Sequence, residues 1–456
     1  MANSNGWGDG AANNTIGWGQ GANNAIGWGD SHLKSWAGLT DIAGFDSSAI
    51  SYFNSTGITG TTQQDAIDNL VRGLKDDGIW TKMKAIYPFA TDNRNLLSYT
   101  EDFTNVLWAS TTATITANSI TAPNGTLTAS LFQANAAFGR ITQSNIRQTA
   151  GTFKTSIYIK GVSGVASIGS IVVNRGVGFT INTSGVVTVN NPVGYNSGSN
   201  FLSESVGNGW YRISFDFAYT TGADGIVIAS SNSGDSFYIW GAQVELNSIL
   251  TAYQPIATTQ QAYISNQFKF NLVNPVDSDA AFRVVFNGGW THSVTGALPN
   301  GTNGYADTKL LGNTDVIKGN FGFGIYSRTN TLTSGAYGVD SSLHIYPRFT
   351  DTNSYYRIFN NSTAVINGTS LGLFSGFNDS TNTSYAWFNA VKKQTLASPL
   401  TITSANLMLS GNVASTGGYD NRQLAFAFAS QYLNDTEVTN LYTRVQAFQT
   451  ALSRQV

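Results

Sequence analysis

Apolar and polar residues alternate along much of this 456-residue chain at a spacing of two, which is the pattern of half-buried β-strands. The alternation is clear at Tyr211, Ile213 and Phe215. Gly, Asn or Ser bounds most of these segments, as expected for short strands joined by turns. Between residues 93 and 255 the pattern predicts strands at 154–161, 170–176, 185–190, 209–219, 225–230 and 236–246. It therefore predicts an antiparallel β-sandwich of the jelly-roll type.

The same alternation returns between about residues 268 and 400 and predicts a second sandwich. Its predicted strands are 281–290, 319–329, 342–349, 354–360, 371–377 and 405–410. The fold class is therefore mainly β, with two antiparallel β-sandwiches and a few helices.

Residues 62–77 carry apolar side chains at the three- and four-residue spacing of a helix face. Thr61 or Thr62 is expected to cap its start, and Gly78 stands where a glycine closes a helix. The next residues, 79–90, read partly as a strand that ends at a proline.

A second helix is predicted at residues 435–453, again from its apolar face. Asn434 and Glu437 have the spacing of a capping box before its first turn. The chain is thus expected to end on an amphipathic helix.

The first thirty residues carry a Gly-Trp-Gly unit three times. Its tryptophans are Trp7, Trp18 and Trp28, and Ile16 and Ile26 lie between them. A segment this short cannot bury three indole rings by itself, so it needs a partner surface, either copies of itself or a larger assembly. The alternative is a flexible low-complexity tail.

Composition narrows the classes of partner. Charged residues make up 11% of the chain and the formal net charge is −2, so there is no basic field for nucleic acid. The chain has no cysteine, which excludes disulfides and thiolate metal sites. No apolar run is long enough to span a membrane, and the N-terminus lacks the pattern of a signal peptide. We therefore expect no cofactor, no metal and no membrane partner.

Catalytic motifs are missing from the sequence. The three histidines, His32, His292 and His344, are far apart, and no nucleophile elbow, zinc motif or phosphate-binding loop occurs. Carboxylate pairs such as Asp76-Asp77 and Glu101-Asp102 do occur, and glycosidases use two carboxylates. With 26 acidic residues, such pairs are also expected by chance. We expect a protein that is not an enzyme.

Binding candidates come from one segment. In Gly-Gly-Trp-Thr-His-Ser, Trp290 could stack on a sugar beside His292, with Tyr305 nearby in the chain; the alternative is a packed tryptophan and a satisfied histidine. Asn303 and Asp307 could ligate Ca²⁺ or belong to a plain turn. Three tryptophans are expected in cores: Trp108, Trp210 and Trp240.

Three stretches resemble a module common in bacteriophage tail and fibre proteins. They are NLLSYTEDFTNVLWASTTATITAN (95–118), GWYRISF (209–215) and IWGAQVELNSILTAYQPI (239–256). The resemblance covers about 160 residues and implies a carbohydrate-binding jelly roll.

Three other stretches resemble a concanavalin-like (laminin-G-like) sandwich of phage proteins: 77–89, 274–310 and 422–456. In similar proteins the first stretch runs almost directly into the second, whereas here about 180 residues separate them. Insertion at a surface loop is tolerated when its ends lie close together. We therefore expect a jelly roll at 93–261 inserted into a concanavalin-like sandwich made of 59–92 plus 262–456.

Residues 1–58, the repeat and a linker, resemble N-terminal segments of fibre and capsid-associated proteins from phages of Bacteroidota, including the crAss-like group. This implies a non-enzymatic virion structural protein, a head or tail fibre or capsid decoration, made in the host cytoplasm and displayed on the virion surface. Trp7, Trp18, Trp28, Ile16 and Ile26 would attach it. Its expected partners are other copies, as a homotrimer, phage capsid or tail proteins, and host or mucin glycans. The alternatives are a receptor-binding tail protein and a capsule-degrading glycosidase.

Overall fold

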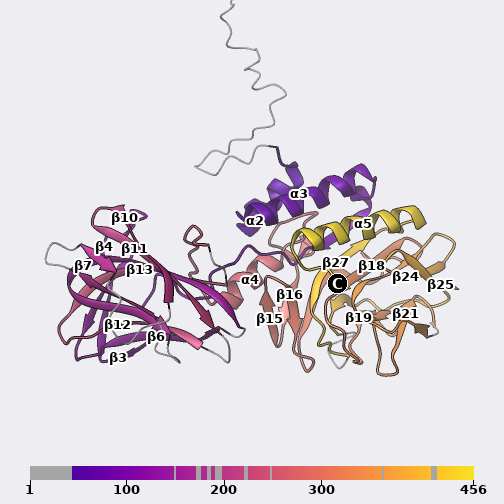
Figure 1. Ribbon diagram of the computed structural model, residues 1–456. Helices are drawn as coiled ribbons and strands as arrows, with labels where there is room; N and C mark the ends of the chain where they lie inside the picture. Colours follow the sequence, from indigo (N-terminus) through magenta and orange to yellow (C-terminus); the bar gives the residue numbers. More distant parts are fainter. Residues whose placement is uncertain are drawn as a thin grey trace, which may run out of the picture. The chain divides into compact units, whose positions relative to one another are not determined.

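The computed structural model describes residues 44–147, 150–170, 176–181, 186–189, 198–219, 224–246, 249–361, 364–411 and 418–456. The predicted attachment residues Trp7, Ile16, Trp18, Ile26 and Trp28 lie outside them. The described chain divides into two compact units. One combines the residues up to Asp92 with Ser265–Val456, and the other is Asn93–Ile264 (Figure 1). We call them the split unit and the inserted unit.

Helix α2 (Ser47–Thr56) lies in residues that the sequence analysis assigned to a linker. Its Ala49, Tyr52 and Phe53 share one face and are buried in the core of the split unit, and Asp46 caps its first turn. These residues are therefore part of the folded unit, because their apolar face is covered.

Helix α3 (Thr61–Asp76) confirms the prediction of a helix at 62–77, but its cap differs from the expected threonine. The N-cap is Gly60, and the Asp92 carboxylate accepts hydrogen bonds from the backbone N–H groups of Thr59 (2.7 Å) and Gly60 (2.9 Å). A residue about thirty positions away thus holds the backbone that leads into the helix, and no side chain caps the first turn. Gly78 closes the helix with a positive φ of 70°, as predicted.

Helix α5 (Asp435–Ala451) confirms the C-terminal prediction, including its capping box. The Asn434 side chain accepts from the backbone N–H of Glu437, whose carboxylate accepts from the backbone N–H of Asn434.

The described residues of the split unit form two sheets and several short helices. The seven-stranded sheet has the order β14-β17-β26-β19-β20-β21-β22, and the eight-stranded sheet runs β15-β16-β27-β18-β23-β24-β25 with β2 beside β27. The strands of the first are β14 (Val285–Asn287), β17 (Tyr305–Leu311), β19 (Tyr337–Asp340), β20 (Leu343–Tyr346), β21 (Asn353–Ile358), β22 (Val365–Ile366) and β26 (Asn406–Leu409). Those of the second are β2 (Met83–Tyr87), β15 (Trp290–Ser293), β16 (Gly296–Pro299), β18 (Phe321–Ser327), β23 (Gly372–Asn378), β24 (Thr383–Phe388), β25 (Val391–Ala397) and β27 (Leu424–Ser430). Two 3₁₀ turns, η2 (Trp80–Lys82) and η3 (Asp279–Ala281), complete it.

The middle of the eight-stranded sheet is buried on both faces, since every residue of β18, β23 and β27 is buried. One face packs against α2, α3 and α5 in a shared core, and the helices cover this sheet in Figure 1. Close strand packing explains the Phe-Gly-Phe-Gly run of β18. A Cβ at Gly322 would lie 2.2 Å from the Phe377 ring, and one at Gly324 would lie 2.6 Å from the Phe428 ring.

The described part of the inserted unit is an antiparallel sandwich whose eleven strands are joined through β7. They are β3 (Ala109–Thr111), β4 (Ala113–Ile120), β5 (Ala129–Ala134), β6 (Arg140–Arg147), β7 (Gly151–Ser170), β8 (Gly176–Ile181), β9 (Val187–Val189), β10 (Gly198–Gly207), β11 (Trp210–Tyr219), β12 (Asp224–Ser230) and β13 (Ser236–Glu245). The first half of β7 pairs with β11 and β13, and its second half pairs with β8 and β12. One apolar core includes Phe215 of β11, which pairs with the first half of β7, and Ile228 of β12, which pairs with the second half.

The length of β7 differs from the sequence prediction of separate strands at 154–161 and 170–176. Gly161, Gly164 and Gly169 read as turn residues, yet here they lie inside a strand that passes from one layer of the sandwich to the other. The mainly β fold class is confirmed for both units.

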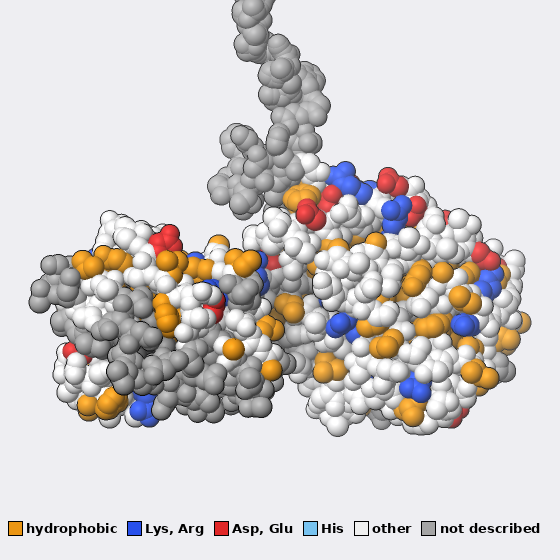
Figure 2. Space-filling view, viewed as in Figure 1, with side chains coloured by type: hydrophobic (Ala, Val, Ile, Leu, Met, Phe, Trp, Pro, Cys, Tyr) orange, Lys and Arg blue, Asp and Glu red, His pale blue; other side chains and the backbone are white. Residues whose placement is uncertain are grey.

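Helix α4 (Gln260–Phe268) contains the boundary between the units. None of the described helices has the length and apolar character needed to cross a membrane. On the face drawn in Figure 2, acidic and basic side chains are sparse and intermixed, and neither sign gathers into a large patch.

Candidate functional site

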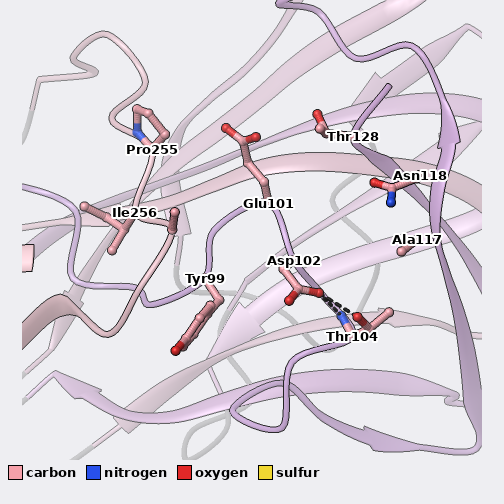
Figure 3. A pocket seen from close by; sticks show the side chains of 10 residues that line it. Tyr99, Glu101, Asp102, Thr104, Ala117, Asn118, Thr128, Pro255 and Ile256 are labelled. Atoms are coloured by element: carbon pink, nitrogen blue, oxygen red, sulfur yellow. Dashed lines mark hydrogen bonds between the residues drawn. The ribbon is translucent and has the colours of Figure 1, made fainter. Parts of the chain in front are cut away.

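A cleft of about 490 Å³ opens in the inserted unit, within the usual range of ligand pockets. It lies between the segment 99–104, strand β4 and the segment 255–257 (Figure 3). Its walls combine a phenol ring, two carboxylates, an amide and small apolar groups. The lining residues are Tyr99, Glu101, Asp102, Thr104, Ala117, Asn118, Thr128, Pro255, Ile256 and Ala257.

Two segments that are distant in the sequence run side by side to form one wall. The backbone N–H of Tyr99 donates to Thr258 O (3.1 Å), and that of Thr100 donates to Ile256 O (2.9 Å). The buried Asn95 side chain donates to the carbonyls of Ala242 and Gln254, each at 3.0 Å. These bonds hold the wall in place without a continuous strand pair.

Two residues of the cleft adopt the left-handed backbone region. Tyr99 has φ 48° and Asn118 has φ 51°. Asparagine tolerates this region, whereas a tyrosine there is uncommon and costs energy. Strained backbone of this kind recurs at binding sites, and the strain at Tyr99 is consistent with such a role, although other described residues also have a positive φ.

An aromatic cluster supports the cleft from behind. The Trp240 ring lies 4.8 Å from that of Tyr253 and 5.2 Å from that of Tyr158, measured between centroids. The indole N–H of Trp240 donates to Thr128 Oγ1 (3.0 Å), so the cluster fixes a lining side chain. Trp240 is 4% exposed and belongs to the core, as predicted.

The Glu101 carboxyl group is partly buried at the edge of this cluster. The Tyr253 hydroxyl donates to Glu101 Oε1 (3.2 Å) and also hydrogen-bonds Thr100 Oγ1 (2.7 Å). Burial raises the pKa of Glu101 above its ordinary value, and the hydrogen bonds from Tyr253 and Trp240 partly offset this rise.

Asp102, the second carboxylate, is engaged in a local turn. Its Oδ1 accepts hydrogen bonds from the backbone N–H (3.1 Å) and the hydroxyl (2.6 Å) of Thr104. Figure 3 shows the Glu101 and Asp102 carboxylates pointing in different directions. A glycosidase needs its two carboxylates to flank one bond.

The sequence candidates Trp290, His292 and Tyr305 lie together in the split unit. The Trp290 and His292 rings are stacked with centroids 6.2 Å apart, and the indole N–H donates to Tyr305 O (3.2 Å). Phe286 meets both rings edge-on, at 5.1 and 4.6 Å. His292 is 5% exposed, and its burial lowers the pKa to about 4. These ring contacts place Trp290 and His292 inside an aromatic cluster.

The other candidates also have structural partners. Asn303 Oδ1 accepts from the backbone N–H of Gly289 (2.9 Å), and Asp307 accepts from Asn406 (2.9 Å) and forms an ion pair with Lys309. These contacts agree with the alternative that Asn303 and Asp307 belong to a plain turn rather than to a Ca²⁺ site. The described residues contain no group of three His, Cys, Asp or Glu side chains that could hold a metal ion. Two other tryptophans are buried as predicted: Trp108 and Trp210.

The lining residues Tyr99, Asn118, Thr128 and Pro255 were not picked out as binding candidates from the sequence. The sequence did contain a signal for the cleft. Two of the stretches that resemble the phage module, 95–118 and 239–256, both contribute residues to it.

No family model matches the chain, and no curated protein matches it. Among solved structures, TmCBM61 in complex with beta-1,4-galactotriose is similar at 13% identity over 34% of this chain and 100% of that chain (TM-score 0.23). The C-terminal family 22 carbohydrate-binding module of Clostridium thermocellum Xyn10B is similar at 14% identity over 36% and 99% (TM-score 0.23). The enzymatically active domain of bacteriophage CBA120 tailspike protein 4 is similar at 20% identity over 34% and 21% (TM-score 0.22). Similarity this low carries no argument about what the chain binds.

Proposed function

We propose that this protein binds neutral oligosaccharides through the cleft of the inserted unit and does so without catalysis. The observation that carries the proposal is the lining: a tyrosine ring at a strained backbone position stands with Glu101, Asp102 and Asn118 around one cavity. Sugars offer apolar ring faces and hydroxyl groups. These side chains offer an aromatic surface for the ring face, and carboxylates and an amide that can hydrogen-bond the hydroxyl groups.

The charge of the lining favours neutral glycans over acidic ones. The two carboxyl groups on the cleft wall belong to Glu101 and Asp102, and no basic residue lines it among the described residues. An acidic sugar would meet like charges, whereas hydroxyl groups of a neutral sugar can donate to carboxylates. The turn that engages Asp102 supports binding rather than hydrolysis, because its carboxylate is not aimed with Glu101 at a common point.

The test uses the intact chain and two matched variants. Asn118→Gly removes the lining amide at a positive φ that glycine adopts without strain. Asn208→Gly makes the same change at an exposed position of the same unit, with φ 53° and outside the cleft. Binding is measured first on an array of neutral oligosaccharides and then by calorimetry with the strongest hit.

We expect Asn118→Gly to weaken binding at least tenfold and Asn208→Gly to leave it unchanged. Absence of neutral-glycan binding, or equal affinities for the two variants, contradicts the proposal. Reducing-sugar release from the same glycans, lost in Glu101→Gln, would replace it with the glycosidase alternative.

We further propose that the chain is a phage virion structural protein that displays this cleft as a surface fibre or decoration, in homotrimers attached through Trp7, Trp18 and Trp28. The regular indoles need a partner surface, and their resemblance to phage fibre segments supports a virion as that surface. The chain should be truncated only to residue 43, because α2 is part of the split unit. We expect loss of particle incorporation and of trimers, by light scattering, after this truncation or after substitution of the three tryptophans by alanine. A monomeric intact chain contradicts it.

A further inference from the structure

The split unit has a second cavity, of about 290 Å³, on the seven-stranded sheet. Strands β20 and β21 supply most of it. Their register pairs His344 with Arg357 and Tyr346 with Tyr355, so these four side chains share one face. The residues that alternate with these four along the strands, including Leu343 and Ile358, are buried on the opposite face. The cavity therefore lies on the face of the sheet that is turned away from the core.

Aromatic rings form the cavity wall. The Tyr346 ring meets the rings of Phe349 and Tyr355 edge-on, with centroids 5.2 and 6.5 Å apart, and Phe349 and Tyr355 meet at 5.8 Å. All three rings are half-buried, so part of each stays accessible. Such rings offer flat apolar surfaces next to polar hydroxyl groups.

His344 forms the floor beside Tyr346, with ring centroids 4.6 Å apart. It is 3% exposed, and its Nδ1 hydrogen-bonds the Asp340 carbonyl oxygen (2.8 Å). Burial lowers its pKa to about 4, so the imidazole is neutral at pH 7. Gly338 lies opposite on β19, where a Cβ would come within 2.6 Å of His344 Cβ. The missing side chain leaves room for the close approach of the β20 backbone.

Arg357 gives the cavity its charge. Among the described residues that line it, Arg357 alone is charged at pH 7. Its Nη1 donates to Ser341 O (3.1 Å), and it takes part in no ion pair with another described residue. The nearby carboxylates are engaged: Asp351 accepts from the Tyr355 hydroxyl (2.5 Å), and Asp340 accepts from the backbone N–H groups of Ser342 and Thr403. The guanidinium therefore keeps donors for an external anion.

We propose that this cavity binds a carboxylate-bearing sugar residue, such as a hexuronic acid, with its ring against Tyr346 and Tyr355 and its carboxylate on Arg357. Arginine binds carboxylates through two parallel hydrogen bonds, and the aromatic wall suits a sugar ring. The volume is near the lower end for ligand pockets, roughly 300 Å³, which fits a single terminal or side-chain sugar better than a long chain. The preference is opposite to that of the acidic cleft in the inserted unit.

The test compares methyl β-D-glucuronide with methyl β-D-glucoside on the intact chain by saturation-transfer NMR titration. Arg357→Gln removes the charge at a half-buried position, and Arg140→Gln is the matched control at an exposed arginine of the inserted unit. We expect the glucuronide to bind at least tenfold more tightly than the glucoside, Arg357→Gln to abolish that difference, and Arg140→Gln to preserve it. Added salt should weaken glucuronide binding alone.

Equal binding of the two glycosides, or a preference that survives in Arg357→Gln, overturns the proposal. Equal competition by acetate and by glucuronide also overturns it, because the site would then recognise a carboxylate without a sugar. The Asn118→Gly variant keeps this site intact, so its loss of neutral-glycan binding and the loss of glucuronide binding in Arg357→Gln are separate results.

Discussion

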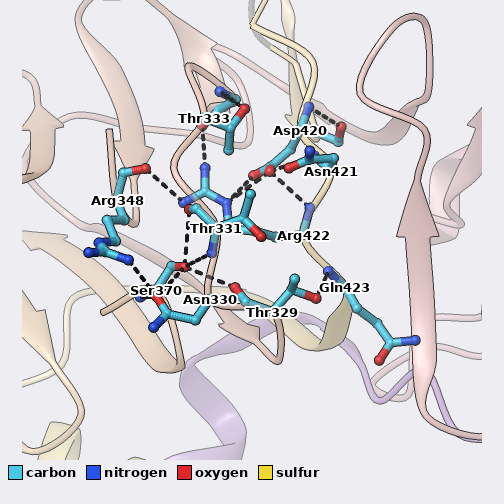
Figure 4. Close-up of polar contacts among 12 residues, drawn as sticks. Thr329, Asn330, Thr331, Thr333, Arg348, Ser370, Asp420, Asn421, Arg422 and Gln423 are labelled. Atoms are coloured by element: carbon cyan, nitrogen blue, oxygen red, sulfur yellow. Dashed lines mark hydrogen bonds and ion pairs between the residues drawn. The ribbon is translucent and has the colours of Figure 1, made fainter. Parts of the chain in front are cut away.

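Replacing Arg422 by methionine is expected to destabilise the split unit by about 3 to 5 kcal/mol, the usual cost of leaving a buried charge without its partner. Arg422 and Asp420 are both 0% exposed. The guanidinium Nε donates to both Asp420 carboxylate oxygens, at 2.8 and 3.0 Å, and Nη2 donates to Gly335 O at 2.9 Å (Figure 4). Methionine fills similar space. The loss therefore comes from the buried Asp420 charge, which keeps backbone N–H donors such as that of Asn421 but loses its cationic partner, and from the Gly335 carbonyl, which loses the guanidinium donor.

An exposed ion pair of the same unit supplies the matched control. Arg444 Nε lies 2.8 Å from Asp77 Oδ2, but the arginine side chain is 38% exposed. Solvent screens this pair, so Arg444→Met should cost at most about 1 kcal/mol. The two substitutions are chemically identical, and only burial separates their expected effects.

The assay is amide hydrogen exchange followed by mass spectrometry on the full chain, read at strands β18 and β27. It measures the opening free energy of the split unit even when the two units unfold separately. Adding Asp420→Asn to Arg422→Met should recover part of the loss, because the uncompensated charge is removed. A loss under about 1 kcal/mol in Arg422→Met, or no recovery in the double variant, refutes the reasoning.

Two further predictions concern pH. Burial lowers the pKa of His292 and of His344 from 6.5 to about 4, so the stability that each neutral ring contributes is present above pH 6.5 and is lost as the pH falls toward 4. The shift corresponds to about 3 kcal/mol for each ring. Hydrogen exchange at pH 7 and pH 4 should show that His344→Gln loses less opening free energy on acidification than the unsubstituted chain does. Equal losses in the two proteins would contradict this. Burial raises the pKa of Glu101 above 4.5, so stability from its protonated form is lost as the pH rises through the raised value. Between pH 4 and 7, the melting temperature of Glu101→Gln should therefore rise relative to that of the unsubstituted chain. A difference in melting temperature that stays constant with pH would count against this.

Local patterns in the sequence predicted about half of the described strands and the amphipathic helices α3 and α5, because alternation and helical spacing follow directly from which face is buried. They failed where the deciding partner is distant. Helix α3 begins at a glycine N-cap rather than at a capping threonine. The residues just before it are held by the Asp92 carboxylate, about thirty positions away, and no local rule indicates such a contact. Helix α2 was missed for the same reason, since its short apolar face is stabilised by the core that it joins.

The cavity on β20 and β21 shows which parts of a binding site can be predicted from the sequence and which cannot. Alternation in Leu-His-Ile-Tyr already places His344 and Tyr346 on the face opposite Leu343 and Ile345. It does not decide which residues of β21 stand beside them, because that depends on the turn between the strands. Here the backbone N–H of Phe349 donates to Asn353 O (2.7 Å) and Thr352 has a positive φ of 74°. This turn sets Tyr346 opposite Tyr355 and His344 opposite Arg357. A slip of one residue would move Arg357 to the core face and leave the aromatic wall without its cation, so the site depends on turn geometry rather than on composition.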